Sequence, residues 1–352
     1  MSFNFIPDNT KDFETLSDFK DQKELFLYLR EHYPKIKDPI AIDLSQKNHV
    51  KVTRGLQGLF NPSTFRKSPK LKISFGEGSR GNRGSANRGN GFETSYLGDI
   101  HYWIEGKKID TQIEKSIEKI FALNKITSRD VVRVIAEGAN NKARPLIFSG
   151  ENIYIGTASD PNVGAVLTDL TIVDATIETE KKNVYLSLKL GKTVTFFNSG
   201  IKTVLTKDDI KSGTIKSEKG IALLNMFGIN HTRFCSVFNA YDKEKAIHYH
   251  EEDTTSTINK SILTKFIKSG IGYGYTMVHN INSSIDVYLI DKAYLDTASV
   301  PQSCKVFYGG KSGDAKRVDM VVETPKYVLK FNIRDKNGGI YPSHILCDYK
   351  KK

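Results

Sequence analysis

The sequence predicts a mixed α+β (α/β) protein with a β-rich C-terminal lobe, and three observations support this fold class. Two amphipathic helical stretches, at about 92–106 and 111–123, precede a run of short β-like segments between 130 and 198. A lysine-rich helical region follows at 201–270, and from 271 to 352 β-branched and aromatic residues alternate as they do in strands. Helices followed by a run of strands are typical of such a core.

The composition is that of a folded protein and excludes a disordered basic tail. The chain has 352 residues, of which 39% are hydrophobic and 10% aromatic, enough to build a full core. Single cores stop growing at roughly 250–300 residues, so the length favours two lobes. The formal net charge of +12 favours a polyanionic partner, nucleic acid first, although a merely soluble basic protein carries such a charge equally well.

The number of cysteines and the length of the apolar runs indicate the cellular compartment in which the protein is used. Cys235, Cys304 and Cys347 are odd in number and far apart, so neither a disulfide framework nor a CxxC metal site is available. No signal peptide is evident at the N-terminus, and no apolar run approaches the roughly 18 residues of a membrane span. We therefore expect a soluble protein, used inside a cell, with no membrane partner.

The first two regions are an N-terminal helical and extended part at 1–65 and a Gly/Arg-rich flexible loop at 66–91. Apolar residues spaced over 11–33 predict a helix in the first region. In the loop, Arg80, Arg83 and Arg88 supply charge suited to phosphates, while an ordinary surface loop remains the alternative. Glycines at 76, 78 and 81 match a nucleotide-binding pattern, but more glycines follow where a helix is needed, so we expect no nucleotide cofactor.

A helix is expected to begin close to Phe92, because Phe92, Tyr96, Ile100 and Trp103 share one face, and Glu93 then falls in its first turn. The following β-like segments are 130–137, 145–150, 152–157, 166–178, 183–191 and 192–198. Between the first two of them, Lys142 and Arg144 are candidates for phosphate contacts, although a polar linker explains them almost as well.

Three polar residues interrupt two of these apolar segments. Asp169 lies in the segment 166–178, and Ser187 and Lys189 share one face of the segment 183–191 because side chains alternate along a strand. A hairpin of the two segments brings Asp169 beside Lys189. An acid and a lysine on core strands are costly to bury unless they are paired or hold a metal. A surface-exposed Asp169 and a solvated Lys189 in a plain hairpin remain the alternative.

Metal-dependent phosphodiester hydrolysis uses such a set of groups. A carboxylate fixes a hard divalent cation, the cation polarises the phosphoryl oxygen, and a lysine orients the attacking water or stabilises the developing charge. The arrangement resembles the PD-(D/E)xK nuclease superfamily, whose core hairpin carries Asp on one strand and (Glu/Asp)-x-Lys on the next. The segment Arg88-Gly-Asn-Gly-Phe-Glu93 is similar to the family's helix starts, which carry a further glutamate.

The resemblance covers about residues 88–200 and departs from the family at two positions. Thr168 stands where proline is usual, and Ser187 stands where the family has an acid. It implies a restriction-endonuclease-like core sheet flanked by helices, with Mg²⁺ or Mn²⁺ held by Glu93 and Asp169. Lys189 would position or activate the attacking water, and Ser187 would either bind a metal-bound water or orient the site.

These observations lead us to expect a restriction-type or phage-encoded endonuclease acting on DNA in the cytoplasm of a bacterial or phage-infected cell. A homodimer would suit the cutting of both strands. The expected division is 1–65, 66–91, a nuclease-like core at 92–200, a lysine-rich helical region at 201–270 and the β-rich lobe at 271–352. Two alternatives stay open, namely a non-catalytic nucleic-acid-binding or virion-associated protein with a nuclease-like core, and a protein-interaction protein.

Overall fold

The computed structural model describes side chains and backbone for residues 92–127, 134–136, 144–156, 161–192, 194–243, 249–282, 284–310 and 315–352. Only the backbone is described for residues 84–91, for Arg133 and for four short N-terminal strands. These strands pair in the order β1-β4-β3-β2 and are β1 (Phe3–Phe5), β2 (Ile40–Asp43), β3 (His49–Val52) and β4 (Lys72–Phe75). The helix expected at 11–33 lies outside the described residues.

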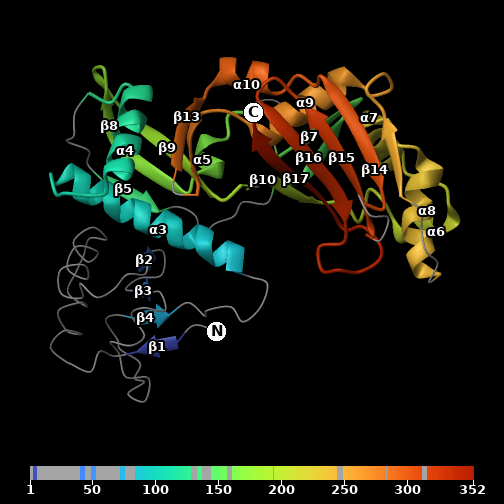
Figure 1. The fold of residues 1–352 in the computed structure, drawn as a ribbon, viewed down its shortest axis with the longest axis horizontal. Helices are drawn as coiled ribbons and strands as arrows, with labels where there is room; N and C mark the ends of the chain where they lie inside the picture. The colour runs from blue at the N-terminus through green and yellow to red at the C-terminus, as the bar shows by residue number, and fades with distance from the viewer. Residues whose placement is uncertain are drawn as a thin grey trace. The chain divides into compact units, whose positions relative to one another are not determined.

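The chain forms two compact units that are interleaved in sequence (Figure 1). The first unit comprises 1–140, 167–191 and 275–289, and the second comprises 141–166, 192–274 and 290–352. Both mix helices with β-sheet and the C-terminal region is rich in strands, so the predicted fold class is confirmed.

The first unit is built on a five-stranded sheet covered by two helices. The sheet order is β13-β12-β9-β8-β5, in which β8 pairs antiparallel with β9 and β9 pairs parallel with β12. The strands are β5 (Arg133–Ala136), β8 (Leu170–Ile177), β9 (Glu180–Leu190), β12 (Tyr275–Ile281) and β13 (Ser284–Ile290), and the helices are α3 (Gly84–Ile104) and α4 (Thr111–Leu123).

Apolar side chains of α3 and α4 pack on one face of this sheet. Ile100 and Ile120 are fully buried against Leu170, Leu186 and Val278, as the helical and strand periodicities predict. Asp110 caps α4, because its Oδ1 accepts hydrogen bonds from the first-turn amides. This packing fixes the C-terminal half of α3 against the sheet next to Asp169 and Lys189.

The second unit contains an antiparallel six-stranded sheet with α9 packed against it. The sheet order is β10-β17-β16-β15-β14-β11, and α9 also contacts the hairpin formed by β6 and β7. Phe266 of α9 lies 5.9 Å, centroid to centroid, from Phe331 and 5.6 Å from Phe197. These rings form the centre of the core of this unit.

The described elements of this unit include five helices besides α9. The elements are β6 (Leu146–Ser149), β7 (Asn152–Ile155), α5 (Gly164–Leu167), β10 (Val194–Gly200), α6 (Lys207–Ser212), α7 (Glu218–Met226), α8 (His231–Asp242), β11 (His250–Asp253), α9 (Lys260–Ile271), α10 (Lys292–Ala298), β14 (Ser303–Tyr308), β15 (Arg317–Glu323), β16 (Tyr327–Arg334) and β17 (His344–Lys351).

Two expectations about the division of the chain differ from this arrangement. The β-rich lobe was expected to run from 271 to 352, but β12 and nearly all of β13 belong to the first unit, beside β9. The segment 192–200, expected in the nuclease-like core, contains β10, which belongs to the sheet of the second unit. Local periodicity identifies a strand but not the sheet that it joins, because parallel and long-range pairings leave no local signal.

Candidate functional site

Asp169 lies immediately before β8, at one end of the β8–β9 hairpin. The two strands pair with Leu170 opposite Leu186, and Glu178 begins the connecting turn with φ 57°. The amide of Asp169 donates a hydrogen bond to the carbonyl oxygen of Leu186 at 2.8 Å. The hairpin predicted from the sequence therefore places Asp169 beside the middle of β9.

The carboxylate of Asp169 is held by three neighbouring groups. Its Oδ2 accepts hydrogen bonds from the amide of Leu188 at 2.7 Å and from Oγ of Ser187 at 3.2 Å. The same oxygen lies 3.5 Å from Nζ of Lys189, and the two side chains are 18% and 25% exposed. Three donors fix the orientation of this carboxylate. Among the described residues, its other oxygen has no hydrogen-bond partner.

Glu93 of α3 completes the acidic part of the site. The pKa of Glu93 is raised from 4.5 to about 7, mainly by burial and also by the charge of Asp169, while Lys189 acts to lower it. The Glu93 carboxyl therefore lies within electrostatic range of Asp169 and Lys189. At neutral pH Glu93 is therefore divided between its protonated and ionised forms.

The helix that carries Glu93 begins earlier than the sequence predicts. It starts at Gly84 instead of near Phe92, so the segment 84–91 is helical backbone and the loop expected at 66–91 ends before it. Glu93 consequently lies in the third turn and not in the first. Each glycine in a helix lowers the stability of the helix by about 1 kcal/mol relative to alanine, so the glycines of residues 84–91 favour a loop. The helix nevertheless includes this segment.

The early start of α3 also removes the reason for discounting a nucleotide loop at Gly76–Gly81. That expectation depended on the lack of a helix just beyond the glycines, and a helix begins at Gly84. Residues 76–83 themselves lie outside the described part of the chain.

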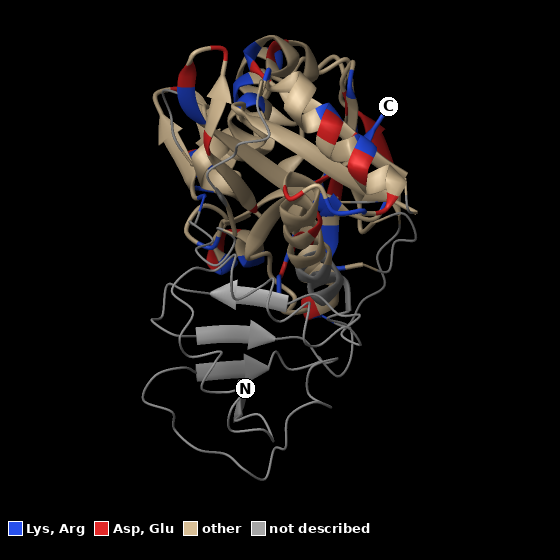
Figure 2. Cartoon of the chain, turned by 90° about the vertical axis from the view of Figure 1, so that its left-hand side faces the viewer, with Lys and Arg blue, Asp and Glu red and all other residues tan. Residues whose placement is uncertain are grey.

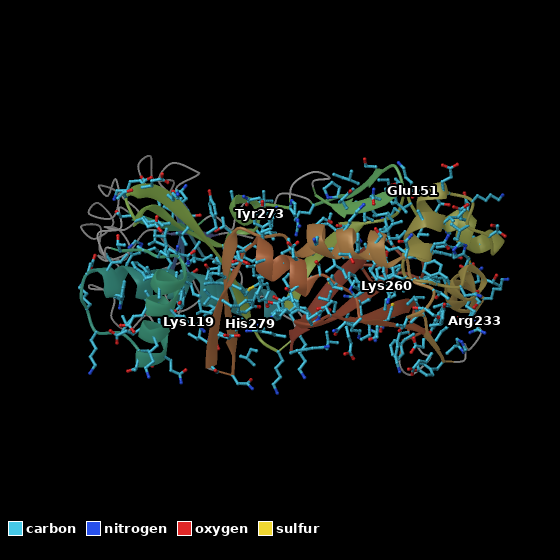
Figure 3. All side chains as sticks on the ribbon, turned by 90° about the horizontal axis from the view of Figure 1, so that it is seen from above. Lys119, Glu151, Arg233, Lys260, Tyr273 and His279 are labelled. Atoms are coloured by element: carbon cyan, nitrogen blue, oxygen red, sulfur yellow. The ribbon has the colours of Figure 1, made fainter. Side chains whose placement is uncertain are left out.

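His279 of β12, which Figure 3 labels, was not recognised from the sequence as a neighbour of Lys189. It pairs in parallel register with Lys189, and its Nε2 lies 2.7 Å from the carbonyl oxygen of Gly191. The amide of Gly191 in turn donates to the carbonyl of Asn280 at 2.9 Å. These contacts fix the end of β9 just after Lys189. Two polar residues, His279 and Asn280, within an apolar strand were the available signal.

The predicted phosphate-binding residues fall into three groups. Arg80, Arg83 and Lys142 lie outside the described residues, and Arg88 is described by its helical backbone alone. Arg144 belongs to the second unit, where Nη1 donates to the carbonyl of Gly270 at 2.9 Å and Nη2 donates to the carbonyl of Ser269. A cation at these last carbonyls of α9 favours the helix electrostatically. A phosphate contact for Arg144 stays a prediction.

The donor set fits Mg²⁺ or Mn²⁺ better than a metal that needs a full protein cage. Within the described residues, no group of three or more His, Cys, Asp and Glu side chains is placed to hold a metal ion. Mg²⁺ is usually bound through one or two carboxylates, several waters and substrate phosphates. Glu93 and Asp169 supply two carboxylates whose mutual repulsion a cation would relieve.

Positive charge is not gathered on a single element. In the view of Figure 2, lysine and arginine positions are interspersed with aspartate and glutamate positions over the described elements. Several lysines of the helices after 202 make local contacts, such as Lys211 with Asp242 at 3.7 Å and Lys268 with Asp296 at 2.6 Å.

In the part of the chain that the structure describes, no helix is both long and apolar enough to cross a bilayer.

Comparison with known proteins adds no relative. No family model matches the chain, and no curated protein or solved structure matches it either.

Proposed function

We propose that this chain is a divalent-metal-dependent endonuclease that hydrolyses DNA phosphodiester bonds on a restriction-endonuclease-like core. The observation that carries the proposal is the convergence of Glu93, Asp169 and Lys189 at one end of the first unit's sheet. Glu93 has a pKa raised to about 7, and a neighbouring carboxylate contributes to that shift. Groups with strongly perturbed pKa values beside a charged partner are concentrated at functional sites.

Each side chain has a definite task in this proposal. Glu93 and Asp169 hold the cation, which supplies charge neutralisation and Lewis acidity at the scissile phosphate. Asp169 is oriented for this by the amide of Leu188 and the hydroxyl of Ser187. Lys189, 3.5 Å from Asp169, directs its ammonium toward the attacking water or the developing phosphoryl charge. We place the enzyme in a bacterial or phage-infected cytoplasm, with a homodimer as the form that cuts both strands.

One observation favours a second candidate function. Ser187 occupies the position where similar nucleases carry an acid, so two carboxylates are present where the family often has three. A non-catalytic nucleic-acid-binding or virion-associated protein with a nuclease-like core is compatible with that loss. Such a protein would bind DNA with strong salt dependence and leave it intact.

Incubation of supercoiled plasmid with the full chain and Mg²⁺ or Mn²⁺ separates these functions. We expect nicked and linear products with the wild type, and a loss of about 10²–10⁴-fold with Lys189→Ala. Lys182→Ala is the matched control, because Lys182 lies on the same strand and pairs with Glu180 at the exposed end of the hairpin. Cleavage that survives Lys189→Ala would refute the site, and salt-sensitive binding without cleavage would favour the second candidate.

A further inference from the structure

A cavity of about 460 Å³ opens within the first unit, between α3, the start of α4 and the strands β12 and β13. Its walls include the rings of Phe92 and Tyr96 and the side chains of Ile113 and Ile285. Asp99 and Asp110 supply the charged part of its lining. The volume lies within the roughly 300–1,000 Å³ that small-molecule pockets occupy.

The cavity borders the candidate nuclease site through two separate links. Phe92, which lines the cavity, precedes Glu93 in α3. Asn280, which also lines it, pairs with Leu190, the residue after Lys189 on β9. A ligand group in the cavity would therefore lie close to a phosphate held at Glu93, Asp169 and Lys189.

The chemistry of the lining selects against phosphate and in favour of a flat ring that donates hydrogen bonds. Among the described residues that line the cavity there are two carboxylates and no lysine or arginine. The rings of Phe92 and Tyr96 lie 5.6 Å apart, centroid to centroid, and the Tyr96 hydroxyl is 2.6 Å from Oγ of Ser116. Tyr96 is fully buried with its hydroxyl engaged, so the aromatic surface that a ligand can reach is the partly buried ring of Phe92, which Tyr96 supports from behind.

Asp110 is placed to accept a hydrogen bond from a ligand. Its Oδ1 caps α4 by accepting from the amides of Gln112 at 2.8 Å and Ile113 at 3.2 Å. Within the described part of the chain, its Oδ2 has no hydrogen-bond partner. A carboxylate oxygen beside aromatic and aliphatic walls suits an exocyclic amino group on a planar ring.

We propose that this cavity takes one unpaired nucleobase that bears an exocyclic amino group, namely cytosine, adenine or guanine. The inference rests on the proposed nuclease function, since the base would belong to the strand whose phosphate is cut. Stacking on aromatic side chains binds any base, and the carboxylates distinguish amino-bearing bases from those with a carbonyl at the same position. The cavity thus determines which nucleotide lies beside the scissile bond.

Calorimetric titration of the full chain with two matched pairs of nucleosides, without divalent metal, tests this inference. Cytidine is compared with uridine, and adenosine with inosine, because each pair differs by an amino group replaced with a carbonyl. We expect the amino-bearing member to bind at least about tenfold more tightly. Equal binding within each pair, or no binding of any nucleoside up to about 10 mM, overturns the inference.

Asp110→Ser is the most informative variant. Serine remains a good N-cap, so α4 keeps its cap while the second carboxylate oxygen is lost. We expect the preference for amino-bearing nucleosides to disappear in this variant and to persist in the control Asp286→Asn, whose parent carboxylate pairs with Lys119 at 3.8 Å. Persistence of the preference in Asp110→Ser contradicts the role of Asp110.

The failure of this inference is distinguishable from the failure of the proposed function. Plasmid cleavage without nucleoside binding overturns the cavity assignment alone. Nucleoside binding with the expected preference, but no cleavage under any metal, leaves the cavity assignment in place and overturns the nuclease.

Discussion

Each of the two units buries an acidic side chain whose pKa is raised, and the surroundings of these two acids are opposite. In the first unit Glu93 faces a second acid, Asp169, and one cation, Lys189. In the second unit Asp319 of β15 is 2% exposed and faces cations, with Oδ2 lying 3.2 Å from Nε of Arg317 and 3.4 Å from Nζ of Lys330.

The balance of charge differs accordingly. Burial raises the pKa of Asp319, while Arg317, Lys330 and Arg334 all act to lower it. At the Glu93 site the neighbouring acid adds to the effect of burial and one lysine opposes it. In the second unit three cations offset part of the cost of burying Asp319, whereas the first unit sets one cation against two acids and so leaves a deficit of positive charge. An external divalent cation would fill that deficit, and this difference supports the proposal that Glu93 belongs to a metal site while Asp319 has a structural role.

The largest expected difference concerns cleavage. Asp169→Ala removes a proposed cation ligand and should lower plasmid cleavage by about 10³-fold or more. Asp319→Asn alters a compensated cluster in the other unit and should leave cleavage within about twofold of wild type. Initial rates from gel-resolved plasmid assays measure both. A comparable loss in the two variants would contradict the distinction drawn between the two acidic sites.

The second prediction concerns stability without metal. The folded pKa of Glu93 exceeds its ordinary value of 4.5, so the folded state holds this proton more tightly and the free energy of unfolding falls as pH rises from about 4.5 to 7. Glu93→Gln removes that cost and should raise the stability at pH 8, by at most about 3 kcal/mol. Urea unfolding at pH 5 and pH 8 measures this.

A gain at pH 8 that is absent at pH 5 would support an electrostatic cost that is retained for function. Equal destabilisation of Glu93→Gln at both pH values would mean that Glu93 serves packing instead.

The third prediction concerns a variant in which Asp319 has fewer neighbouring cations and so resembles Glu93. Lys330→Met removes one of the cations facing Asp319, so the buried carboxylate loses part of its compensation. We expect the free energy of unfolding to fall by about 1–2 kcal/mol at pH 8 and by less at pH 4, because the raised pKa of Asp319 leaves less of its charge for Lys330 to offset at the lower pH. The expected loss of stability is small because Lys330 is 39% exposed, and solvent screens its charge. An equal loss at both pH values would point to packing of the lysine stem as the cause.

The smallest expected effect is that of Ser187→Ala. Ser187 is 2% exposed, and its hydroxyl is one of three groups that hold Oδ2 of Asp169. The amide of Leu188 and Lys189 remain, so we expect cleavage to fall by about three- to tenfold, as for the loss of one hydrogen bond. Steady-state cleavage rates test this. A loss as large as that of Asp169→Ala would instead make Ser187 indispensable to the site.

How much of the site could be predicted from the sequence depends on how far apart in the chain the interacting residues lie. Alternation along a strand and the proximity of hairpin partners are local, so the approach of Asp169 to Lys189 was predictable. The position of His279 was not, because β12 joins β9 in parallel after a separation of 88 residues between His279 and Gly191. The start of α3 at Gly84 was also missed, because a Gly-rich segment carries only a weak local helix signal.

Binding of Mn²⁺ to the full chain, measured by calorimetry at pH 8 and pH 6, tests the central claim most directly. If Glu93 and Asp169 share a cation, one ion should bind, and about tenfold more weakly at pH 6, because Glu93 must lose a proton near pH 7. Glu93→Gln should weaken binding and remove most of this pH dependence, while Asp319→Asn should leave both unchanged. Binding that is insensitive to Glu93→Gln and to pH would contradict the account.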